Sequence, residues 1–164
     1  MQNAKDTFYT TLRDRLAAVN SARTMVVRGV TRPAVLVEEN ELPSDAVPVD
    51  AFRLRWVGLK VDPNGALPRV TMSCEIRYAT DGNSGNGGMD RGRLLAAMDA
   101  ELASALSEHP RSAVKMSYSV APPLAMGTKV FWGDAAFGAA AVVGERLERV
   151  ATVEVFCYQE AGEL

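Results

Sequence analysis

The fold is decided by 51-AFRLRWVGLKVDPNGALPRVTMSCEIRYA-79, which contains two apolar runs joined by a turn. In the second run, residues from Val70 to Tyr78 alternate between apolar and polar side chains, as in a strand with one buried and one wet face. Between the runs, residues 62–65 (DPNG) favour a turn because proline presets φ and Asn-Gly tolerates positive φ. The stretch therefore predicts a long β-hairpin and, with it, an antiparallel sheet.

Two helices are predicted, one on each side of this hairpin in the sequence. Phe8, Leu12 and Leu16 recur at steps of four, which indicates an amphipathic helix over residues 3–19. Leucine and methionine recur at the same spacing over residues 90–108, among alanines that raise helix propensity. We expect the second helix to be the long central helix of the fold.

Shorter strands are predicted in the rest of the chain. TMVVRGV (24–30) and PAVLVEENEL (33–42) read as short strands, followed by a loop through Pro43, Ser44, Asp45 and Pro48. A strand with Val114, Met116, Tyr118 and Val120 follows the long helix. The last run, ERVATVEVFCYQ (148–159), is apolar on both faces for much of its length, which places it centrally in the sheet.

The length and composition fit one ordinary globular domain. The chain has 164 residues, of which 48% are hydrophobic and 23% charged, so it can bury a core of its own. The expected fold is a single α+β domain over residues 1–164, with a mainly antiparallel β-sheet packed against the N-terminal helix and the long central helix.

Charge and hydropathy narrow the classes of partner. Eighteen basic and twenty acidic residues leave a net charge of −2, so no global field attracts nucleic acid, which is not expected as a partner. No apolar run reaches the length of a membrane helix, and the start MQNAKDTFYT lacks the apolar core of a signal peptide. We therefore expect no membrane association and a cytoplasmic location.

The glycine-rich stretch 80-TDGNSGNGGMDRGRLL-95 is the segment that most resembles a ligand site. It lacks the Gly-Lys-Ser/Thr of a phosphate-binding loop, the third glycine of a dinucleotide fingerprint and the glutamate of an EF-hand. We expect a flexible loop at about 80–89 that ends where Asp90 caps the long helix. Arg91 and Arg93 would then oppose the helix dipole in its first turn, which makes sense if an acidic partner surface meets them.

No catalytic, metal or cofactor site emerges from the remaining residues, and no cofactor is expected. His109, the one histidine, precedes a proline at a helix end and has no recognisable nucleophile motif with it. Cys74 and Cys157 lie in apolar strand-like runs, where reduced core cysteines are more common than a disulfide or metal site.

Candidate interface residues come from two segments besides the glycine stretch. Arg53 and Arg55 lie on one hairpin strand, where they mark a solvated sheet face or a charged interface between subunits. Phe131, Trp132 and Phe137 lie in a glycine-flanked apolar segment. That segment either packs onto the sheet as core or docks as an apolar arm on a neighbouring copy.

The order of elements resembles the tail terminator and tail completion proteins of tailed bacteriophages and prophages. The resemblance spans nearly the whole chain and rests on layout, above all on the helix AAMDAELASAL (96–106) after a β-hairpin. It implies an α+β subunit that assembles into a homo-oligomeric ring, with tail or head–tail proteins as further partners and a virion-associated location. No residue-level signature is matched, so no site residues are carried over from that family.

A second class of function competes with this one. The chain could be a small-ligand-binding domain or an uncharacterised enzyme, with its pocket between the sheet and the long helix near Trp132 and Tyr118. Such a pocket needs convergent polar groups, which the sequence does not reveal.

Overall fold

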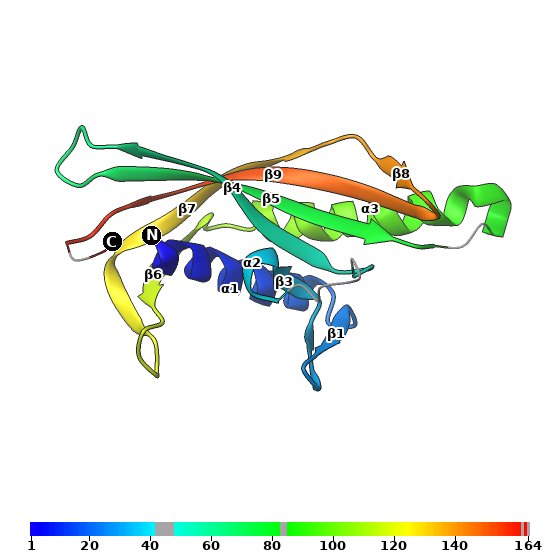
Figure 1. Ribbon diagram of the computed structural model, residues 1–164, viewed down its shortest axis with the longest axis horizontal. Coiled ribbons are helices and arrows are strands. Elements are labelled where there is room, and N and C mark those ends of the chain that lie inside the picture. Colours follow the sequence, from blue (N-terminus) through cyan, green and yellow to red (C-terminus); the bar gives the residue numbers. More distant parts are fainter. Residues whose placement is uncertain (42–47, 83–84, 162, 164) are drawn as a thin grey trace.

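The computed structural model describes residues 1–41, 48–82, 85–161 and 163. These residues form one α+β domain in which helices cover one face of a curved, mainly antiparallel sheet, as Figure 1 shows. The predicted fold class is confirmed. Pro43, Ser44 and Asp45, in the predicted loop, lie outside the described residues.

The described elements follow one another along the chain as a helix, a small hairpin, the long hairpin, a second long helix and the remaining strands. Their bounds are α1 (Gln2–Val19), β1 (Thr24–Val27), β2 (Val30–Pro33), β3 (Val35–Val37), α2 (Glu38–Glu41), β4 (Phe52–Asp62), β5 (Arg69–Thr80), α3 (Gly85–Ser107), β6 (Ser112–Ser117), β7 (Leu124–Phe137), β8 (Ala141–Val143) and β9 (Arg146–Tyr158).

The main sheet has the order β3-β4-β5-β9-β7-β6, and β8 pairs with β9 beside the end of β7. All of these pairs are antiparallel except β3 with β4. The predicted hairpin is β4 with β5, and the predicted central strand is β9, which is bonded on both sides. The strands β1 and β2 form a separate hairpin.

The core lies between the sheet and the two long helices, and we call this side of the sheet the helix face. On β5 the alternation predicted from the sequence holds, with Val70, Met72, Cys74, Ile76 and Tyr78 all fully buried. They pack against apolar side chains from α1, from α3 and from the neighbouring strands. Among the described elements, no helix covers the opposite side, which we call the open face (Figure 1).

Polar contacts fix the two helices relative to each other. Arg15 of α1 donates hydrogen bonds to the carbonyl oxygens of Ala105, Glu108 and Pro110 at distances of 2.6–3.2 Å. These carbonyls belong to the end of α3 and the residues after it, where helices leave backbone acceptors unpaired. The guanidinium therefore caps one helix from the surface of the other.

The long helix α3 begins earlier than predicted. It starts at Gly85, so Asp90 lies inside it rather than at its cap, and Arg91 and Arg93 are not in its first turn. Residues 85–89, predicted to belong to the loop, are therefore helical despite the low helix propensity of glycine. Gly82 has a structural reason of its own: its φ is +49°, and a Cβ there would lie 2.9 Å from the Cα of Arg91.

Three of the shorter strands also differ from the prediction. A turn at Arg28 and Gly29 divides residues 24–30 into β1 and the start of β2. Residues 38–41 form the short helix α2 instead of continuing a strand. In β6 a shift of register between Val114 and Met116 turns Lys115 inward and leaves Val114 half exposed. The alternation read from the sequence could not show this bulge.

Candidate functional site

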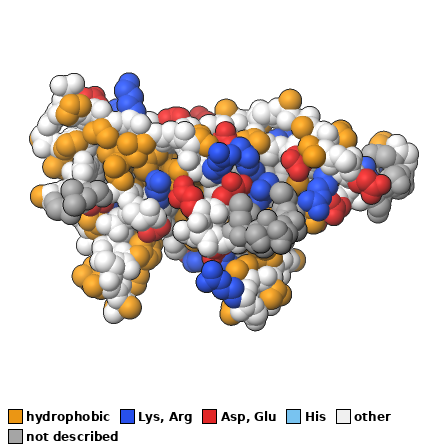
Figure 2. All heavy atoms as spheres, in the orientation of Figure 1, with side chains coloured by type: hydrophobic (Ala, Val, Ile, Leu, Met, Phe, Trp, Pro, Cys, Tyr) orange, Lys and Arg blue, Asp and Glu red, His pale blue; other side chains and the backbone are white. Residues whose placement is uncertain are grey.

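The outer half of the long hairpin extends past the helices, and we call residues 55–69 the arm. It projects from one end of the sheet in Figure 1. From Val57 onward both faces of β4 are exposed, and the side chain of Leu59 is 50% exposed. Val61 and Leu67 are exposed as well. In Figure 2 hydrophobic side chains gather at this end of the molecule.

The arm also has a free strand edge. Strand β3 pairs with β4 only over Phe52–Leu54, so among the described residues no strand covers Arg55–Asp62 on that side. A backbone edge of this length, with apolar side chains beside it, is a ready template for another strand.

The open face next to the arm carries a small aromatic cluster. The rings of Phe131 and Phe156 stack with their centroids 5.3 Å apart, and the guanidinium of Arg69 lies 5.5 Å from the Phe156 centroid. Tyr158 beside them is exposed. Aromatic and arginine side chains in this setting are typical of protein interfaces.

A second exposed apolar segment lies at the opposite end of the sheet, and we call residues 134–145 the far edge. It comprises the end of β7, the strand β8 and the turn after it. Val142 is 75% exposed, and Val143 and Phe137 are also exposed. Strand β6 pairs with β7 only as far as Phe131, so among the described strands none pairs with the outer side of this edge.

The structure separates the candidate interface residues into two groups. Arg55, Arg93 and Phe137 are exposed, and Phe131 and Arg91 are half buried. Arg53 and Trp132 lie inside the fold. Trp132 is 4% exposed and donates to the carbonyl oxygen of Leu106, so at this position the segment packs as core.

The burial of Arg53 has an electrostatic explanation. Its guanidinium lies 3.1 Å from the carboxylate of Glu38, and both side chains are largely buried. Burial lowers the pKa of Arg53, while the charge of Glu38 opposes that effect. The pair joins α2 to β4 and leaves no free charge for a partner.

The sequence did not indicate Leu59, Val61 or Val142 as surface residues. Apolar residues in strands normally predict core. No local pattern distinguishes them from core residues, because their exposure depends on where α1 and α3 lie relative to the hairpin.

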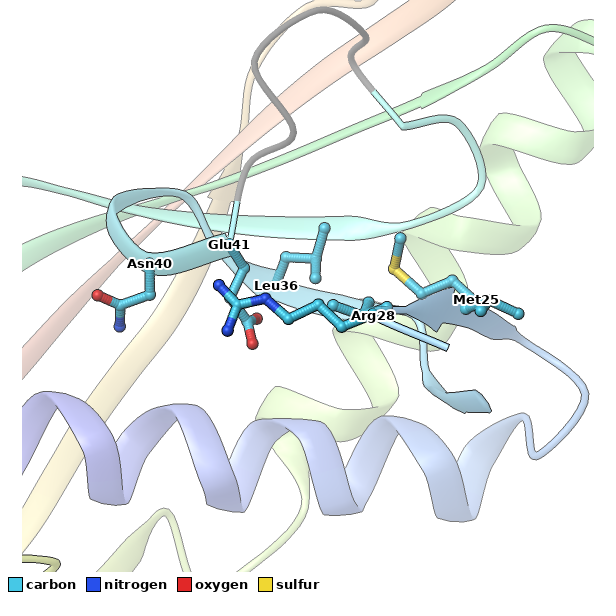
Figure 3. A pocket seen from close by; sticks show the side chains of 7 residues that line it. Met25, Arg28, Leu36, Asn40 and Glu41 are labelled. Atoms are coloured by element: carbon cyan, nitrogen blue, oxygen red, sulfur yellow. The ribbon is translucent and has the colours of Figure 1, made fainter. Parts of the chain in front are cut away.

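The surface of the described residues has several hollows, and one of about 460 Å³ lies beside the arm, where Asp62, Arg69 and Tyr158 line it. The hollow in Figure 3 has a volume of about 350 Å³ and is lined by Met25, Arg28, Leu36, Asn40 and Glu41, with Val26 and Val27, from β1, its turn, β3 and α2. Another hollow, between α3 and β7, measures about 150 Å³. It is smaller than the 300 Å³ or more that ligand pockets usually need.

Buried polar groups tie elements together rather than line a cavity. The hydroxyl of Tyr78 donates to Asp99 at 2.5 Å, and Arg149 lies 3.3 Å from the same carboxylate. Burial and this hydrogen bond raise the pKa of Tyr78, so its proton stays in the link between β5 and α3. Among the described residues, no group of three or more His, Cys, Asp or Glu side chains could hold a metal ion.

Both cysteines are core residues, as predicted. Cys74 and Cys157 are free thiols buried on the helix face. Burial raises the pKa of Cys74 to about 12, and it raises the pKa of Cys157 as well. Neither thiol is a nucleophile at neutral pH.

Comparisons with known proteins assign no family to this chain. No family model matches it, and no curated protein does. Among solved structures, a chain described as "Virion of native gene transfer agent (GTA) particle" is similar at a TM-score of 0.42 and 13% sequence identity. The match covers 96% of this chain and 98% of that one. At a TM-score below 0.5 the likeness assigns neither fold nor function. Within the described part of the chain, no helix is long and apolar enough to cross a membrane.

Proposed function

We propose that this chain is a structural subunit that assembles with copies of itself into a ring. This is the role of the tail terminator and head–tail joining proteins that its sequence layout resembles. Other tail or head–tail proteins would then bind the assembled ring.

The observation that supports the proposal best is the arm. Four large apolar side chains, Val57, Leu59, Val61 and Leu67, are exposed on it, next to a strand edge that no described strand covers. Arg55, Lys60 and Asp62 place charges along this edge, but they leave the neighbouring apolar side chains exposed to water. Burial against another chain would remove both the apolar surface and the unpaired backbone from water.

The competing function, a ligand-binding domain or an enzyme, has weaker support. It requires a pocket between the sheet and the long helix, where the structure has a hollow of only about 150 Å³. Trp132, expected in its wall, is buried in the core.

The test is the mass of the protein in solution and its image by electron microscopy. We expect the wild type to sediment as a defined oligomer and to show rings. The double variant Leu59→Asp/Val61→Asp should be monomeric at the same concentration, because it places charges in the buried interface. Val26→Asp is the matched control, since Val26 is 67% exposed on the β1–β2 hairpin. A wild type that stays monomeric at high concentration and shows no rings would remove the basis of the proposal.

A further inference from the structure

The arm and the far edge complement each other in charge. The arm contains three basic residues and one acidic residue, namely Arg55, Lys60, Arg69 and Asp62. The far edge contains two acidic residues and no basic residue, namely Asp134 and Glu145. The side chain of Asp134 is 84% exposed, although it pairs with Arg111. The two segments lie at opposite ends of the sheet (Figure 1), so one copy cannot bring its own pair together.

Strand direction is also compatible with a join between two copies. Strands β4, β5 and β9 alternate in direction, and β8 runs antiparallel to β9. A neighbouring copy that continues the sheet with the same face inward would therefore place its β4 antiparallel to β8. An antiparallel pair of this kind needs no change in either backbone.

The pleat of the strands places apolar side chains of both segments on the helix face. Leu59 lies opposite Met72, which is buried on the helix face, so Leu59 points to that side. Val142 lies opposite Leu147, which packs against the core, and therefore also points to the helix face. A continued sheet would bring Leu59 and Val142 together in one apolar row.

From these three observations we infer that the arm's partner is the far edge of a second copy, joined head to tail by pairing β4 of one subunit with the β7–β8 edge of the next. The inference rests on the proposed self-assembly and names the surfaces that make it. Because the two surfaces differ, each copy keeps one free end for the next copy, and the contact closes into a ring or continues as a filament.

Cysteine cross-linking tests the contact without interference from the native thiols, because both are buried. The variants are Leu59→Cys and Val142→Cys, made singly and together in one chain, and the probe is a short bifunctional maleimide. We expect a mixture of the two single variants to give covalent dimers, and the double variant to give a ladder of higher species. Each single variant alone should give neither product.

The control replaces Leu59→Cys with Val26→Cys, an exposed position away from both surfaces. Equal cross-linking of Val26→Cys to Val142→Cys would overturn the inference, as would a covalent dimer of Leu59→Cys with itself, which indicates a two-fold contact. If the wild type forms rings but the mixed variants do not cross-link, this inference fails and the proposed function stands. If the wild type is monomeric, both fail.

Exchanging charges between the two surfaces tests the same contact independently. Arg55→Glu should weaken association about tenfold, because the pairing of Leu59 with Val142 places Arg55 beside Glu145 of the next copy and the change puts like charges across the contact. Adding Glu145→Lys should restore most of the loss. A second change that gives no recovery would contradict the pairing of these two segments.

Discussion

Replacing Lys115 by methionine should destabilise the fold strongly, because this lysine is fully buried. Its ammonium donates to the carbonyl oxygen of Tyr158 and to the carboxylate of Glu163, both at 2.6 Å, and lies 3.5 Å from Glu160. These contacts hold the end of β9 and the residues after it against β6. Methionine keeps the apolar stem of the side chain but removes every one of them.

The size of the stability loss follows from the buried carboxylate of Glu163, which loses its lysine partner. The side chain of Glu163 is only 6% exposed, and removing one partner of a buried pair usually costs 3–5 kcal/mol. The N-terminal ammonium remains 3.7 Å from Glu163, so we expect the low end, about 3 kcal/mol. With a urea dependence of about 2 kcal/mol/M, the unfolding midpoint should fall by about 1.5 M.

The pH dependence of the stability deficit distinguishes an unpaired Glu163 carboxylate from a simple loss of packing. Burial raises the pKa of Glu163, but Lys115 and the other partners outweigh it and hold that pKa below its usual range. Without Lys115 the pKa rises, so the carboxyl becomes neutral as the pH falls and the deficit of the variant shrinks. Lys129→Met, on the exposed side of β7, is the matched control and should change stability by less than about 0.5 kcal/mol. A Lys115→Met deficit below about 1 kcal/mol at pH 7 would refute the reasoning.

Two further predictions concern the native state of the monomer. Neither thiol should react with a disulfide reagent before unfolding, and both should react in denaturant; fast labelling of native protein would contradict the burial of Cys74 and Cys157. Burial raises the pKa of Glu101, but hydrogen bonds from Arg23 and Asn20 and the charge of Arg23 outweigh it, so this pKa lies below its ordinary value. Hydrogen bonds from Thr128 lower the pKa of Glu160. Their stabilising effect is complete above their ordinary pKa of 4.5 and is lost as the pH falls through the lower folded values, so urea midpoints should drop from pH 5 to pH 3. Midpoints that stay level over this range would show that these pairs contribute nothing.

Much of the fold could be predicted because local signals and tertiary structure agree. The alternation from Val70 to Tyr78 and the steps of four from Phe8 to Leu16 both mark residues that are buried in the structure. The apolar character of β9 correctly indicated a strand bonded on both sides. In each case one periodicity identifies the element and the face that it buries.

The features that escaped prediction depend on contacts between distant segments. The burial of Lys115 requires a bulge in β6 together with acidic residues from the other end of the chain. The exposure of Leu59 depends on where α1 and α3 end relative to the hairpin, which no local pattern records. For the same reason the sequence could not show that Arg53, predicted at an interface, forms an ion pair with Glu38 inside the fold.

The register of β9 sets the geometry of any ring built through the inferred contact. Val142 lies opposite Leu147, whereas Leu59 lies opposite Met72 and, through it, Val155. These two positions on β9 are eight residues apart, or about 26 Å along the strand. Each copy adds about four strand widths, roughly 19 Å. Successive copies therefore shift along their strands further than they advance across them, and the strands of a closed ring would be inclined by about 50° to its axis.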